Sequence, residues 1–106
     1  MASDIQIIQD LKIRLCVEFG SEIQQIILFG SRSSSSSNEF SDYDVLLVMK
    51  NKLDFQQKRR ISEICYDVEL QNDIIIDLHV LSELELSSLR GKQPIFQKAI
   101  HKGIHV

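Results

Sequence analysis

The sequence predicts one α/β or α+β domain spanning residues 1–106, with a small mixed β-sheet and helices packed against it. Short, nearly continuous runs of Ile, Val and Leu are typical of strands buried on both faces. Between these runs, apolar residues spaced three or four apart indicate amphipathic helices. The length of 106 residues suffices for one hydrophobic core and is too short for two.

The order predicted along the chain is helix, strand, strand, helix, strand, helix. A capping box of Ser3 and Gln6 begins the first helix, and Gly20 ends it. Pro94 suits the first turn of the last helix. The predicted ranges are helices at 5–19, 53–70 and 94–101, strands at 23–29, 43–49 and 74–81, a short helix and loop at 82–90, and an edge strand at 104–106. About 12 residues join the first two strands, so either orientation of this pair is open.

Composition excludes several classes of protein. The net charge of −3 offers no basic footprint for general nucleic-acid binding. No run of 18 apolar residues is present, so no membrane span is expected. The N-terminus has no secretory signal pattern, and we expect a cytoplasmic protein. Cys16 and Cys65 are then expected to be free, buried thiols.

Gly30-Ser31 stands where the first strand turns into a polar segment. A glycine at this point lets another group approach the backbone closely. Backbone N–H groups that begin at Ser31, together with its hydroxyl, suit a phosphate. An ordinary turn is the alternative interpretation of these two residues alone.

Asp42-Tyr43-Asp44 opens the second strand, and residues two apart in a strand project from the same face. Two carboxylates beside an apolar run repel each other unless something offsets their charge. Mg²⁺ does so well, because it takes one or two carboxylates together with phosphate oxygens. A solvated start of the strand is the alternative.

Asp77 interrupts an isoleucine-rich strand, where a lone charge needs a reason. If this strand lies beside that of Asp42 and Asp44, three carboxylates converge and could hold two metal ions about 3.5–4 Å apart for phosphoryl transfer. A half-exposed strand with Asp77 in solvent is the alternative. His79 shares the strand face of Asp77, and we interpret it as a polar strand position more readily than as part of a site.

Gly30-Ser31, ten further residues, and Asp42-Tyr43-Asp44 followed by Val45-Leu46-Leu47-Val48 resemble the signature of the polymerase-β-like nucleotidyltransferase superfamily. The short chain is similar to the minimal nucleotidyltransferase (MNT) group, which is often paired with HEPN-domain proteins. The resemblance extends to the strand Ile76-Asp77-Leu78 and to the closing segment 94–106. It implies the nucleotidyltransferase fold.

The resemblance also implies roles for individual residues. Gly30 and Ser31 would hold the β- and γ-phosphates of a nucleoside triphosphate, with ATP as the expected donor. Asp42 and Asp44 would bind two Mg²⁺ ions, and Asp77 would bind one of them and help to activate an acceptor hydroxyl. The product would be AMP attached to that hydroxyl, which a HEPN-type toxin could supply. Apart from the resemblance, Arg32 is a further candidate for phosphate contact, with a solvated surface arginine as the equal alternative.

One departure from the family pattern bears on function. Family members often have Ala-Arg-Gly or a close equivalent after the Gly-Ser pair, whereas this chain has Ser33-Ser34-Ser35 within a serine run at 33–37. We therefore keep a second hypothesis, an antitoxin-like module that neutralises a partner by contact with weak or absent catalysis. A plain α/β domain with surface acids is a third. The acceptor, the preferred nucleotide and any homo-oligomer are left open.

Overall fold

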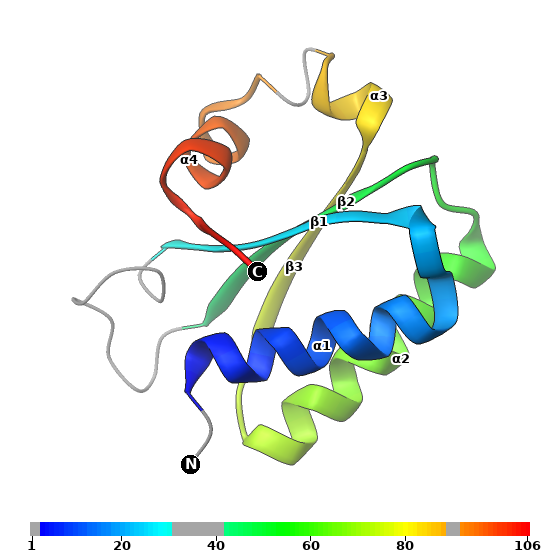
Figure 1. Cartoon of the computed structure of the whole chain (residues 1–106), viewed down its shortest axis with the longest axis vertical. Coiled ribbons are helices and arrows are strands. Elements are labelled where there is room, and N and C mark those ends of the chain that lie inside the picture. The colour runs from blue at the N-terminus through cyan, green and yellow to red at the C-terminus, as the bar shows by residue number, and fades with distance from the viewer. Residues whose placement is uncertain (1–2, 31–41, 89–91) are drawn as a thin grey trace.

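A four-stranded mixed sheet forms the centre of the computed structural model, which describes residues 3–30, 42–88 and 92–106 (Figure 1). The strand order is β3-β2-β1-β4. Strand β1 pairs antiparallel with β2 and with β4, whereas β2 and β3 are parallel. The strands are β1 (Ile23–Phe29), β2 (Tyr43–Met49), β3 (Ile76–Ser82) and β4 (Ile104–His105). The orientation of the first two strands, which the sequence left open, is thus antiparallel.

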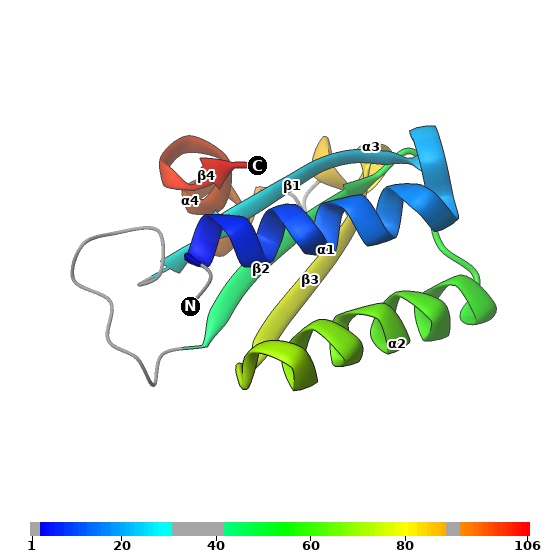
Figure 2. The same ribbon diagram turned by 60° about the horizontal axis from the view of Figure 1, so that its bottom comes forward.

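Helices cover both faces of this sheet. The long helices α1 (Asp4–Phe19) and α2 (Phe55–Asn72) run along one face, and α4 (Pro94–Lys102) lies on the other (Figures 1 and 2). A 3₁₀ turn, η1 (Gly20–Glu22), leads from α1 into β1, and the short α3 (Glu83–Leu86) follows β3. Because α2 connects two parallel strands, it forms the crossover that such a pair requires.

Strand alternation divides the core into two layers. Ile26, Leu28, Val45 and Leu47 belong to the layer that packs on α1 and α2. The intervening side chains point to the opposite face, where Phe96 and Ala99 of α4 cover them. These side chains are Ile27, Phe29, Leu46, Val48 and Leu81. Residues 42, 44, 77 and 79 alternate in step with these side chains, which places those within β2 and β3 on the α4 side of the sheet.

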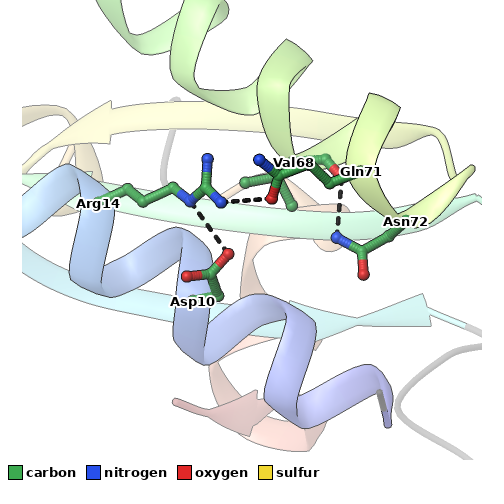
Figure 3. Close-up of polar contacts among 5 residues, drawn as sticks. All are labelled: Asp10, Arg14, Val68, Gln71 and Asn72. Carbon is green, nitrogen blue, oxygen red and sulfur yellow. Dashed lines mark hydrogen bonds and ion pairs between the residues drawn. The ribbon is translucent and has the colours of Figure 1, made fainter. Parts of the chain in front are cut away.

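Polar contacts join the two helices of the opposite layer (Figure 3). Arg14 forms an ion pair of 3.0 Å with Asp10 one turn earlier on α1, and it also donates a hydrogen bond to the side-chain carbonyl of Gln71 on α2. Asn72 closes the end of α2 by donating to the carbonyl of Val68 at 2.9 Å. Exposed ion pairs of this kind contribute little, so the buried apolar residues of this layer are the stronger link between the helices and the sheet.

Most predicted elements are confirmed, including the Ser3–Gln6 capping box. The third strand begins at Ile76 rather than at residue 74, because Asp73 ends α2 in a left-handed conformation and the Ile74 N–H still bonds to the carbonyl of Glu69. Cys65 is buried as expected, whereas Cys16 is only half-buried. Among the described residues, no helix is both long and apolar enough to span a bilayer.

Candidate functional site

Asp44 and Asp77 lie directly opposite each other on the parallel strands β2 and β3. On the other side of Asp44, Phe29 of β1 is its register partner, so Phe29, Asp44 and Asp77 form one row across the sheet. Directly opposed residues in a sheet project from the same face. The two carboxylates therefore point together toward the α4 side, at the ends of the strands.

Gly30 immediately follows β1 and packs against the carboxylate of Asp44. Its φ of +72° lies in the left-handed region that favours glycine. A Cβ atom on residue 30 would collide with Oδ2 of Asp44 and would stand 3.1 Å from its Cγ. The predicted close approach to this glycine is therefore made by Asp44, which needs this space to take its position.

Electrostatics at Asp44 disfavour its charged form. Partial burial raises the pKa of this carboxyl, and the negative charge of Asp77 raises it further, whereas His79 acts in the opposite direction. A weaker contribution from Asp42 and a hydrogen bond with Asp77 also raise the pKa. Without a cation, this pair gains from a proton on Asp44; a bound cation would instead stabilise both groups in their charged forms.

His79 completes the group. One ligand atom each from Asp44, Asp77 and His79 lies within 4.8 Å of the others, a spacing that a single metal ion can span. The Nε2 atom of His79 is 3.5 Å from Oδ2 of Asp77. The imidazole ring contacts Phe29 of β1 and Phe96 of α4, with ring centroids 5.8 and 5.9 Å away.

The remaining candidates lie at the margin of this group or outside the described residues. Asp42 precedes β2 and is exposed, and it is not among the three residues grouped within 4.8 Å. It still acts on Asp44 through its charge. Ser31 and Arg32, the candidate phosphate-binding residues, lie outside the described residues, so their roles stay predictions.

The arrangement fits a divalent cation. Two carboxylates and one imidazole are ordinary ligands for such ions. A cation between them would offset the repulsion that raises the pKa of Asp44. Both carboxylates retain access to solvent, since the side chain of Asp77 is 55% exposed and Asp44 is only half-buried, so a bound ion could still reach the phosphate groups of a ligand.

The structure places His79 beside the two aspartates, whereas the sequence favoured a polar strand position for it. The signal was its position two residues after Asp77, which places both side chains on the same strand face. What the sequence could not show is that Phe29 and Phe96 flank the ring and that its Nε2 atom is directed toward Asp77.

Comparisons with known proteins agree with this geometry. The model of the nucleotidyltransferase domain family matches residues 10–100. A relative from Methanocaldococcus jannaschii, named "Putative protein adenylyltransferase MJ0141", is 32% identical over 72 residues, which cover 68% of this chain and 73% of the relative.

Solved structures show the same fold at lower identity. A chain from a mutant of the toxin–antitoxin pair MntA-HpeT has a TM-score of 0.60 and 19% identity, with 92% of this chain and 70% of that chain covered. A toxin–antitoxin structure with AMP-PNP has a TM-score of 0.56 and 20% identity, with the same coverage. The complex of tri-AMPylated Shewanella oneidensis HEPN toxin with MNT antitoxin has a TM-score of 0.50 and 20% identity, with 94% and 69% covered. The family match over most of the chain, together with the paired carboxylates of β2 and β3, shows that this protein belongs to the nucleotidyltransferase domain family.

Proposed function

We propose that this chain is a Mg²⁺-dependent adenylyltransferase that moves AMP from ATP onto a hydroxyl group of a partner protein. The observation that carries the proposal is the in-register pair of Asp44 and Asp77 beside the glycine that ends β1. The family match supports transfer of a nucleotidyl group. The adenylyl group and the protein acceptor are inferred from the name of the relative in Methanocaldococcus jannaschii.

In this proposal the acidic residues form the metal site. Asp44 and Asp77 would hold one divalent ion between them, and Asp42 would join Asp44 in holding a second. The spacing of Asp42 and Asp44 equals that of two aspartates replaced by glutamate in the MntA-HpeT mutant. The bound Mg²⁺ would neutralise charge on the triphosphate and on the leaving pyrophosphate. Ser31 and Arg32, which follow Gly30 in the chain, are proposed to contact the β- and γ-phosphates.

The proposed reaction is an in-line displacement. The acceptor hydroxyl oxygen forms a bond to the α-phosphorus, the bond from that phosphorus to the bridging oxygen breaks, and pyrophosphate leaves. Asp77 accepts the hydroxyl proton, because its side chain is 55% exposed and can be reached by an incoming group. Asp44, which is more enclosed, keeps a holding role.

The acceptor is proposed to be a HEPN-type protein. In the Shewanella oneidensis complex, a HEPN toxin is tri-AMPylated and bound to an MNT antitoxin. The fold similarity supports the same kind of partnership for this chain. A protein encoded next to this one in its genome is the first acceptor to test.

The test measures transfer of label from ATP labelled at the α-phosphate to that neighbouring protein in the presence of Mg²⁺. Wild type should label the partner covalently, and Asp44→Asn should slow transfer by about 100-fold or more. Asp73→Asn is the matched control, since Asp73 ends α2 in a left-handed conformation that Asn also tolerates. Unchanged transfer by Asp44→Asn would refute the assigned site.

A second arm addresses the contact-only alternative. The double variant Asp42→Ala, Asp44→Ala is tested for neutralisation of the partner in cells. Loss of neutralisation supports the enzymatic proposal. Neutralisation equal to that of wild type would favour a module that acts by binding alone.

A further inference from the structure

We propose that His79 is a nitrogen ligand of the metal site and that it makes the site prefer a first-row transition-metal ion, with Mn²⁺ as the probe, over Mg²⁺. This inference rests on the proposed Mg²⁺-dependent function. It concerns which ion the site binds more tightly, and Mg²⁺ remains able to support the transfer. Three observations carry it: the placement of the His79 ring, the missing hydrogen bond of its Nε2 atom, and the distances between the ligand atoms of Asp44, Asp77 and His79.

The ring is held in place before any ion binds. Phe29 contacts it at an interplanar angle of 47° and Phe96 contacts it edge-on at 75°. Aromatic pairs in such geometry contribute about 0.5–1.5 kcal/mol each beyond the burial of their area. Because Phe29 is on β1 and Phe96 is on α4, two separate elements fix the direction in which the imidazole points.

The Nε2 atom lacks a hydrogen-bond partner among the described residues, although Asp77 lies within ion-pair distance. It is inaccessible to solvent and forms no hydrogen bond with the part of the chain that the structure describes. The 3.5 Å to Oδ2 of Asp77 is longer than a good hydrogen bond. A buried polar atom without a partner is costly, and a bound ion would supply the missing interaction.

The distances suit one ion bound by all three residues. Ligand atoms that bind a common ion at about 2.0–2.2 Å lie roughly 3–4.4 Å apart. The 3.5 Å between Nε2 of His79 and Oδ2 of Asp77 falls in this range. All three ligand atoms lie within 4.8 Å of one another, so small side-chain adjustments suffice to close the site.

Ligand chemistry then sets the preference. Mg²⁺ favours oxygen ligands in strict octahedral geometry, so replacing one oxygen by an imidazole nitrogen disfavours it. First-row transition ions accept a mixed set of carboxylate and imidazole ligands. Mn²⁺ binds most weakly in that series, so a preference for Mn²⁺ over Mg²⁺ is the most stringent test.

The experiment measures binding of each metal alone to the full chain. Free Mn²⁺ is followed by electron paramagnetic resonance, and Mg²⁺ by competition with Mn²⁺. His79→Phe removes the nitrogen and keeps an aromatic ring between Phe29 and Phe96, and His101→Gln controls for adventitious binding by an exposed histidine. His79→Phe should weaken Mn²⁺ binding about tenfold or more, with Mg²⁺ binding changed less than about threefold. His101→Gln should bind both ions as wild type does.

A spectroscopic readout on wild type does not depend on how any variant folds. Electron spin-echo modulation from an imidazole nitrogen bound to Mn²⁺ is expected, and its absence from bound Mn²⁺ would overturn the inference. Asp44→Asn distinguishes a failure of the His79 ligand from a failure of the whole metal site. If it weakens Mn²⁺ binding while His79→Phe does not, the metal site stands and the inference about His79 fails. If neither variant weakens Mn²⁺ binding, the proposed metal site itself fails.

Discussion

Replacing Gly30 by alanine should damage the metal site through a contact that can be stated from the structure. The new Cβ would collide with Oδ2 of Asp44, so this oxygen must move by on the order of 1 Å to reach the 3.4 Å of ordinary contact. A displaced side chain of this kind leaves its preferred rotamer at a cost of about 0.5–1.5 kcal/mol. The φ of +72° adds backbone strain of about 1–3 kcal/mol.

Gly20→Ala is the matched control. Gly20 also has a positive φ, of +55°, so alanine there incurs comparable backbone strain, but its Cβ would meet nothing within 4 Å. Both variants should melt roughly 5–15 °C below wild type, because 1 kcal/mol corresponds to several degrees in a domain of this size. Stability alone therefore does not distinguish the two positions.

Metal affinity does distinguish them. Calorimetric titration with Mn²⁺, at a temperature where both variants are folded, should show affinity about 10–100-fold weaker for Gly30→Ala. Gly20→Ala should stay within about twofold of wild type, since residue 20 lies at the other end of β1. Equal affinity of the two folded variants would refute the idea that Gly30 makes room for a metal-binding Asp44.

Three further predictions concern stability and reactivity. Asp44→Asn should stabilise the metal-free protein at neutral pH, because the raised pKa of Asp44 means that its ionised form opposes folding above that pKa. The gain in the free energy of unfolding should therefore vanish in acid. An equal gain at all pH values in denaturant melts would contradict this. Tyr43→Phe removes the hydrogen bond from a buried phenol to Asp4 and should lower the free energy of unfolding by about 1–2 kcal/mol, whereas an unchanged denaturation midpoint would argue against it. Burial raises the pKa of the Cys65 thiol to about 12. In a Cys16→Ser variant, iodoacetamide at pH 8 should therefore modify Cys65 only after the protein unfolds. Rapid labelling of the folded protein would be inconsistent with that burial.

Local patterns were enough to predict the elements and part of the site. The capping residue Ser3 and the close approach to Gly30 follow from rules that act over a few residues. The shared face of Asp42 and Asp44, which such rules also predict, stays a prediction. The class of fold followed from buried strands with intervening helices. The family comparisons confirm the resemblance that these motifs indicated.

Register and ring packing required the folded chain. The pairing of Asp44 with Asp77 depends on how α2 sets β3 beside β2, and the contact of Gly30 with Asp44 depends on the antiparallel pairing of β1 and β2. His79 belongs to the group because its ring packs against Phe96 of a later helix. Such long-range packing is not encoded in the spacing of neighbouring residues.

Anomalous diffraction from crystals soaked in Mn²⁺ and a non-hydrolysable ATP analogue is the most direct test of the metal–nucleotide site. We predict a Mn²⁺ peak between β2 and β3, within about 2.0–2.4 Å of a carboxylate oxygen of Asp44 and of Asp77, and in contact with a phosphate oxygen of the analogue. A bound analogue with no metal at these two carboxylates, or a metal peak at another place on the protein, would contradict the account.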